Sequence, residues 1–479
     1  MNCLGLGMAV LVLGKLIWCQ GTGYRPSRWV VADNRWGGRS SRYIMGCAAI
    51  FFLVFIVYVL NARSEFDQAT LAFEYLTGSV PWLPRSYDRS ASVDLLINYG
   101  ALVCGMFATR EWLLGVHRTE VTPATLGSSS LVGEPSEVRY RSRLVLMVLV
   151  ANSAIIGLVG VLQRELGNEM LLGFYKPRFW NPDSHFGPFV YRGNAATYYN
   201  LVGVVGLYLL VTAPDRMKRR ARSRFGGDIS IVGYPICIFL FLVPWLLGSR
   251  AGFLVSIFTL GAVGVGFLLV SRSKGRTAFV FLVALGVLSV GSWKLGSGVA
   301  VSRLIGTFDP VSDRSGLHRL SVYGKVPVML KGNWVWGTGP GTFASIYQMY
   351  REPRTHAPNN RVLEFWQVWA HSDPLETLIT FGLVGSGLLG LLVVSFLVDP
   401  VIRDGLRFFS DYRWLLYVGV AGFVIHSFVD FPFQVYGLLH LFLTICAVLL
   451  ASGRAVRESD RNWLESGARI RTRQILEMQ

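Results

Sequence analysis

Long apolar runs alternate with short polar connections along most of this 479-residue chain. A helix needs about 20 apolar residues to cross the roughly 30 Å hydrocarbon core of a bilayer. The pattern predicts ten membrane-spanning helices, at 44–60, 95–113, 143–162, 196–213, 231–248, 251–270, 277–294, 375–398, 414–430 and 432–451. The run 2–18 is short and contains Lys15, so it is either an eleventh span or a signal-like segment.

The positions of lysine and arginine predict the orientation of these spans. The connection 214–230 carries six basic residues, which places it on the cytoplasmic side. Alternation of the spans then places four further basic segments on the same side: 21–43, 271–276, 399–413 and 452–479. The outer side receives 61–94, 163–195, the turn at Ser249 and Arg250, and the long segment 295–374.

The fold class that follows is an all-α polytopic membrane protein with about 10–12 transmembrane helices and one long outer, periplasmic loop that contains short helices. The predicted parts are an N-terminal segment 1–43 with a possible extra span and a basic cytoplasmic stretch, transmembrane helices in 44–294, the outer loop 295–374, C-terminal transmembrane helices in 375–451, and a basic cytoplasmic tail 452–479. Within the loop, 319–331 is predicted to form an amphipathic helix on the membrane despite Pro327.

Composition narrows the class of protein. Hydrophobic residues make up 52% of the chain and charged residues only 16%, against about 25% charged in soluble proteins, so a large soluble enzyme is excluded. The formal net charge of +17 indicates basic loops that face anionic membrane lipid, and no nucleic-acid partner. The six cysteines show no CxxC spacing, so neither a disulfide framework nor a zinc site is expected.

Several arginines are predicted to lie on the outer face. Arg250 sits between two apolar runs, so its side chain either snorkels to the interface or binds an anion there. Arg192 and Asn194 come just before a span, and Arg319 lies in the long outer loop. Because a guanidinium group pairs bidentately with phosphate oxygens, clustered arginines at this face would suit a phosphate or pyrophosphate group.

Other outer residues suggest proton chemistry and its support. His371, one turn before a span, is a candidate proton acceptor, and Asp373 either orients it or caps the helix. Gly339, in GTGPGTF, is either loop punctuation or a point of close backbone approach. His426 and Asp430, near the outer end of a span, either support a polar cavity or form hydrogen bonds between helices.

Five short stretches carry a family resemblance. They are GPFVYRGNAATYYNL, LGSRAGFLVSIF, RLSVYGKVPVMLKGNWVWGTGPGTFASIY, AHSDPLETLITFGLVGSGL and VIHSFVDFPFQV. In this order they resemble the signatures of the O-antigen ligase-like membrane family, which includes O-antigen ligases, Wzy-type polysaccharide polymerases and protein O-oligosaccharyltransferases. The similarity extends from about residue 187 to residue 436, more than half of the chain.

The resemblance implies a GT-C-like glycosyltransferase in the bacterial inner membrane, with its active site on the periplasmic side. The donor would be a glycan on undecaprenyl pyrophosphate, whose pyrophosphate Arg250 and Arg319 would hold, with Arg192 as a further ligand. His371 would act as the general base on the acceptor hydroxyl, with inversion at the anomeric carbon. The acceptor stays open between lipid A core, a growing glycan and a protein.

No cofactor and no metal are expected, because the outer loops lack an acidic cluster suited to Mg²⁺ and arginines can stabilise the leaving pyrophosphate. A flippase or transporter for lipid-linked glycans is the alternative function. Transporters usually show paired repeats and polar residues near the centres of their spans. Here the polar residues of interest gather at outer span ends and in one outer loop, which favours surface chemistry.

Overall fold

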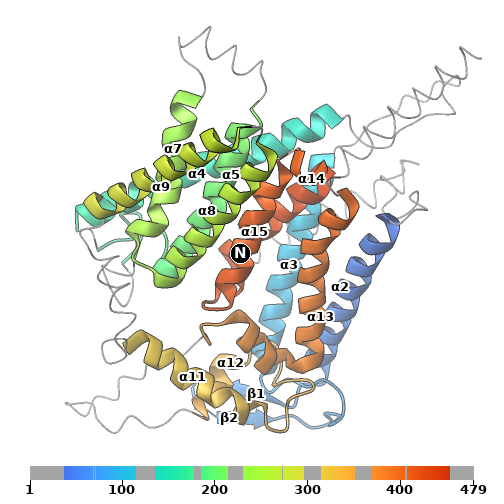
Figure 1. Ribbon diagram of the computed structural model, residues 1–479. Coiled ribbons are helices and arrows are strands. Elements are labelled where there is room, and N and C mark those ends of the chain that lie inside the picture. The colour runs from blue at the N-terminus through green and yellow to red at the C-terminus, as the bar shows by residue number, and fades with distance from the viewer. Residues whose placement is uncertain are drawn as a thin grey trace, which may run out of the picture.

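The computed structural model describes most of the chain as a helical bundle (Figure 1). The described residues are 37–67, 69–70, 72–114, 135–167, 169–176, 185–213, 230–271, 273–295, 314–350, 369–404, 407–410 and 412–453. The elements are α2 (Gly37–Leu60), β1 (Ser64–Asp67), β2 (Ala72–Tyr75), α3 (Arg89–Leu114), α4 (Pro135–Glu165), α5 (Arg192–Val211), α7 (Ser230–Leu246), α8 (Arg250–Val270), α9 (Lys274–Leu295), α11 (Arg314–Leu330), α12 (Phe343–Gln348), α13 (Asp373–Asp404), α14 (Arg407–Ser410), α15 (Arg413–Ser427), the 3-10 turn η3 (Pro432–Gln434) and a last helix Tyr436–Gly453.

Six of these helices are long and apolar enough to cross a membrane: Arg89–Leu114, Glu137–Glu165, Arg192–Val211, Arg250–Val270, Asp373–Val398 and Tyr436–Gly453. The other four predicted spans fall on α2, α7, α9 and α15. The apolar parts of the first three are shorter, and α15 has 15 residues. A mostly helical fold is therefore confirmed, and its six long apolar helices are compatible with a polytopic membrane protein by length and composition. The possible span 2–18, the basic segment 214–229 and the tail from 454 lie outside the described residues.

Two boundaries differ from the sequence prediction. The predicted span 414–430 stops as α15 at Ser427, and the chain then turns through η3 before the last helix begins at Tyr436. Pro432 at the start of η3 lacks a backbone donor and cannot continue a helical hydrogen-bond ladder from α15. The turn places Asp430 at the end of the bundle, outside the helix that was expected to contain it.

One antiparallel hairpin, β1–β2, departs from the all-α expectation. It pairs Phe66 with Phe73 across the strands, with ring centroids 4.9 Å apart. The turn is closed by Asp67, whose carboxylate accepts the backbone N–H of Ala69 and the hydroxyl of Thr70 at 2.9 and 2.8 Å. An Asp at this position of a tight turn is a common local solution, and two four-residue strands give too short a pattern to predict.

The helices that carry the candidate site share one end of the bundle. Along α5, Thr197 contacts His426 near the end of α15, and Asn200 donates to the carbonyl of Gly252 near the start of α8 at 2.9 Å. The starts of α5 and α8 therefore lie beside the end of α15. In Figure 1, α11, α12 and the hairpin gather below the helices as a cap.

The glycine-rich loop before α12 is held against a break in α13. The helix is interrupted at Gly382, whose φ is 62°. Backbone groups of the loop form hydrogen bonds with the helix backbone at this break. The N–H of Thr338 donates to the carbonyl of Ile379 at 2.9 Å, and the N–H of Leu383 donates to the carbonyl of Trp334 at 2.9 Å. A glycine break in a helix leaves such groups without intrahelical partners, so the loop and the break in α13 stabilise each other.

Candidate functional site

His371 lies in a short segment immediately before α13, and its backbone is fixed on both sides. Its φ is +57°, a left-handed conformation that is unfavourable for a residue with a Cβ. The carbonyl of His371 accepts the hydroxyl of Tyr323 at 2.8 Å, and the preceding N–H of Ala370 donates to the carboxylate of Glu376 at 2.8 Å. Strained conformations of this kind persist where surrounding contacts impose them, often at functional sites.

Asp430 faces the imidazole of His371. Its Oδ1 lies 3.4 Å from Nδ1 of His371 and accepts the backbone N–H of Phe431 at 3.1 Å. The Asp430 side chain is 1% exposed, whereas that of His371 is 22% exposed. A carboxylate at Nδ1 favours the tautomer that carries its proton there, which leaves Nε2 free to accept a proton. The pair thus has the arrangement of a general base and the group that orients it.

Arg319, on α11, adds a positive charge to this pair. Its Nη1 donates to the carbonyl of Val429 at 2.9 Å, and its Nη2 donates to the hydroxyl of Tyr191 at 3.1 Å. Burial by itself would lower the pKa of the Arg319 guanidinium, but Tyr191 and Asp430 outweigh burial and raise that pKa above its ordinary value. Arg319 is therefore a fixed, permanently charged cation beside the His371–Asp430 pair.

Tyr191 links the arginine to the carboxylate. Burial raises the pKa of its hydroxyl, and the nearby Asp430 raises it further, whereas Arg319 lowers it. The Tyr191 ring stacks on Phe431 with centroids 5.4 Å apart and an interplanar angle of 16°, and it meets the edge of the His371 ring at 6.0 Å. Tyr191 remains neutral at physiological pH and acts as a rigid hydrogen-bonding spacer between the charged groups.

The start of α5 is packed tightly against this cluster. A Cβ built at Gly193 would lie 2.3 Å from Oδ2 of Asp430 and 2.4 Å from Cε1 of Tyr191, so only glycine fits without a shift. Arg192, the first residue of α5, and Asn194 in the same turn are both half-buried. The close approach of Gly193 therefore brings the backbone of this first turn of α5 against the Asp430 carboxylate.

His426 is buried behind Asp430. The hydroxyl of Thr197 donates to the carbonyl of Gly193 at 3.0 Å, and its oxygen lies 2.7 Å from Nδ1 of His426. Nε2 of His426 lies 3.9 Å from Oδ2 of Asp430. His426 therefore forms a helix-to-helix hydrogen bond, one of its two predicted alternatives, and its support of a polar cavity stays a prediction.

Arg250 begins α8 at the same end of the bundle. Ser249 caps the helix, since its Oγ accepts the N–H of Gly252 at 3.2 Å. A Cβ at Gly252 would lie 2.3 Å from the Cβ of Ala196, one helical turn along α5 from Arg192. Since a turn of helix rises about 5.4 Å, the backbones of Arg192 and Arg250 start from neighbouring positions.

Two predicted supporting residues have structural contacts. Asp373 is the first residue of α13 rather than its cap, and its Oδ2 accepts the N–H of Phe433 at 2.9 Å, which ties α13 to the turn after α15. Gly339, with φ of 107°, packs so closely on Ser86 that a Cβ would lie 2.5 Å from its hydroxyl. Gly339 thus fixes the loop against the segment before α3, and its contacts are with the scaffold.

Sequence reasoning did not single out Tyr191, Tyr323 or Phe431, although all three touch the charged cluster. Tyr191 directly precedes Arg192, and Phe431 directly follows Asp430. An aromatic residue adjacent to a candidate charge is the signal available in the sequence. It is weak, because aromatic residues are also common at membrane interfaces.

The structure is thus a mostly helical bundle with six helices long and apolar enough to cross a membrane, and with a charged, aromatic-walled cluster at one end. Within the described ranges, no group of three or more histidine, cysteine or acidic side chains is placed to hold a metal ion. Comparison with protein-family models and with curated proteins found no match for the chain.

Proposed function

We propose that the protein is a membrane glycosyltransferase of the O-antigen ligase or polymerase type. It would move a glycan from undecaprenyl pyrophosphate to an acceptor hydroxyl at the periplasmic face of the bacterial inner membrane. The observation that carries this proposal is the cluster of His371, Asp430 and Arg319, held together by Tyr191. These four residues come from four separate segments of the chain and supply both a base and a cation.

The proposed reaction is a single displacement. Nε2 of His371 accepts the proton of the acceptor hydroxyl as its oxygen bonds to the anomeric carbon, and the resulting imidazolium is stabilised by Asp430. The bond from the anomeric carbon to the pyrophosphate oxygen breaks at the same time, and the pyrophosphate leaves with the electron pair. One displacement inverts the anomeric configuration.

The leaving group is stabilised by arginine in this scheme. Arg319 is fixed beside the base, and Arg192 and Arg250 begin helices at the same end of the bundle. Positive groups that are already oriented before the reaction stabilise developing charge most effectively, because they need no reorganisation. We therefore propose that transfer needs no metal ion, with all three arginines as pyrophosphate ligands.

A flippase is less consistent with this arrangement. A transporter would place its substrate groups near the membrane midplane, whereas His371 and Asp430 lie at helix ends, before α13 and after α15. An oriented imidazole whose side chain is 22% exposed suits a role in proton transfer. It has no evident role in moving a glycan across the membrane.

Reconstitution tests the proposal directly. The purified full-length protein in nanodiscs would receive undecaprenyl-pyrophosphate glycan with EDTA and, in separate reactions, a lipid A core, a glycan or a serine-containing peptide. We expect one acceptor to be glycosylated, and His371→Ala to lower the rate by roughly 10²–10⁴-fold, the usual contribution of a general base.

The control variant is Asp67→Asn. The Asp67 carboxylate lies in the exposed hairpin turn, so this substitution should not affect transfer. Loss of all transfer in EDTA would contradict the metal-free mechanism. Cells with His371→Ala that trap the lipid-linked glycan on the inner leaflet would instead identify a flippase.

A further inference from the structure

A cavity of about 130 Å³ lies beside the cluster, between α3, α12, the start of α13 and the turn after α15. Its size is below the roughly 300–1,000 Å³ of drug-sized ligand pockets. It is close to the engineered cavity of about 150 Å³ that accepts a benzene ring. The space therefore suits one six-membered ring rather than a chain of rings or a lipid tail.

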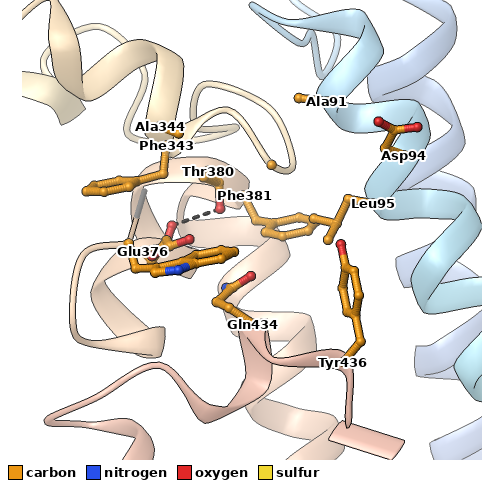
Figure 2. A pocket seen from close by; sticks show the side chains of 12 residues that line it. Ala91, Asp94, Leu95, Phe343, Ala344, Glu376, Thr380, Phe381, Gln434 and Tyr436 are labelled. Atoms are coloured by element: carbon orange, nitrogen blue, oxygen red, sulfur yellow. Dashed lines mark hydrogen bonds between the residues drawn. The ribbon is translucent and has the colours of Figure 1, made fainter. Parts of the chain in front are cut away.

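The walls combine aromatic surfaces with hydrogen-bonding groups. Figure 2 shows the side chains of Glu376 and Gln434 between the ring of Phe343 and the rings of Phe381 and Tyr436. A pyranose sugar has C–H faces that pack on aromatic rings and hydroxyls around its edge that bond to carboxylates and amides. Few polar groups set among aromatic walls are typical of a site that orients a small ligand.

The charge of the walls distinguishes this cavity from the arginine cluster. Asp94 and Glu376 both line it, and no lysine or arginine occurs among its described lining residues. Glu376 keeps one oxygen, Oε2, on the N–H of Ala370 at 2.8 Å. Two acidic side chains with no cation beside them disfavour a phosphate group or an acidic sugar, and favour a neutral sugar whose hydroxyls form hydrogen bonds with these groups.

Trp369 connects the cavity to the base. It lines the cavity and also stacks on Phe431, with ring centroids 5.6 Å apart and an interplanar angle of 16°. Phe431 in turn meets the His371 ring at 5.0 Å. The cavity is thus linked to the His371 imidazole through two aromatic side chains, Trp369 and Phe431.

We propose that this cavity, the ring pocket, binds one uncharged sugar ring of a glycan that takes part in the transfer. The inference rests on the proposed function for its biological meaning, but the binding itself does not require turnover. The ring belongs either to the donor glycan or to the acceptor glycan, and both present the same chemistry to the pocket.

Binding is measured with methyl glycosides on the full-length protein in nanodiscs, by saturation-transfer NMR. The probes are the methyl glycosides of glucose, galactose and N-acetylglucosamine, with methyl glucuronide as the anionic comparison. We expect saturable binding of at least one neutral glycoside and about tenfold weaker binding of the glucuronide, which corresponds to about 1.4 kcal/mol. Trp369→Leu should weaken neutral binding about tenfold.

Two further variants keep the test decisive. Trp334→Leu changes a tryptophan that is 61% exposed and lies outside the ring pocket, so it should bind as the unmodified protein does. Asp94→Asn removes a charge from an exposed position and should narrow the difference between the glucuronide and the neutral glycosides even if Trp369→Leu fails to fold. The proposal is overturned if no neutral glycoside saturates, or if Asp94→Asn leaves the preference for neutral sugars unchanged.

Transfer kinetics separate the source of the ring and the two proposals. A rise in KM for the donor alone in Asp94→Asn identifies a donor sugar, and a rise for the acceptor alone identifies an acceptor sugar. Sugar binding that depends on Asp94 without any glycan transfer would support the ring pocket and contradict the transferase. Glycan transfer without any saturable sugar binding would support the transferase and contradict the ring pocket.

Discussion

Replacing Asp430 with asparagine tests whether this carboxylate orients and stabilises the proposed base. The amide oxygen can still accept the N–H of Phe431, which Oδ1 now accepts at 3.1 Å, so the turn after α15 should keep its conformation. What is lost is the negative charge 3.4 Å from Nδ1 of His371. We therefore expect a folded protein with impaired chemistry.

The size of the effect follows from that distance. Two unit charges 3.4 Å apart attract by about 5 kcal/mol at an effective dielectric constant near 20. Since the His371 side chain is 22% exposed, water screens part of this, and we expect a loss of about 3–4 kcal/mol in the transition state. At about 1.4 kcal/mol per decade, kcat should fall by roughly 10²–10³-fold.

The assay is initial-rate transfer from undecaprenyl-pyrophosphate glycan, with kcat and KM determined separately. Because Arg319 bonds Val429 and Tyr191 rather than Asp430, the donor KM should change little. Asp67→Asn serves as the matched control at an exposed turn. If Asp430→Asn retains the kcat of the unmodified protein, the imidazole is oriented by something else and the proposed pair is wrong.

Two other substitutions test the arginine and the packing of the cluster. Arg319→Lys leaves one nitrogen in place of the two that now reach the carbonyl of Val429 and the hydroxyl of Tyr191. The KM for the donor, measured from donor-dependent rates, should therefore rise by about one to two orders of magnitude. An unchanged KM would exclude Arg319 as a pyrophosphate ligand. Gly193→Ala should lower the thermal unfolding midpoint through a clash worth about 1–3 kcal/mol. The control Gly387→Ala should leave the midpoint unchanged, because no atom lies within 4 Å of its added Cβ. Equal midpoints for the two variants would show that the first turn of α5 relaxes without cost.

Apolar run length was a good guide to the helices and a poor one to their ends. Each of the ten predicted spans between 44 and 451 overlaps a helix, because a helix satisfies the backbone hydrogen bonds of an apolar segment within the segment itself. The end of α15 was misplaced because hydropathy continues through Phe428 and Val429, while the helix already stops at Ser427. Hydropathy does not detect where Pro432 prevents the helix from continuing.

The candidate site was predictable as a set of residue types but not as a set of contacts. Arg319 and Val429 are 110 positions apart, and His371 and Asp430 are 59 apart. Span alternation could place them on one side of the membrane, yet lateral distance within that side depends on helix packing. The predicted roles of Asp373 and Gly339 were ambiguous for the same reason, since their partners, Phe433 and Ser86, come from other segments.

The opposite charges of the two neighbouring regions constrain how a donor would bind. A glycan on undecaprenyl pyrophosphate is anionic at its lipid end and carries hydroxyls at its sugar end. If the ring pocket holds a sugar of the donor, Arg319 would attract the pyrophosphate, whereas the acidic side chains of Asp94 and Glu376 in the ring pocket would not. The reverse orientation would bring the pyrophosphate to these acidic groups, so one orientation would be favoured. The bond that breaks would then lie between the two regions, and His371, whose ring contacts Phe431, is the base that we propose for it.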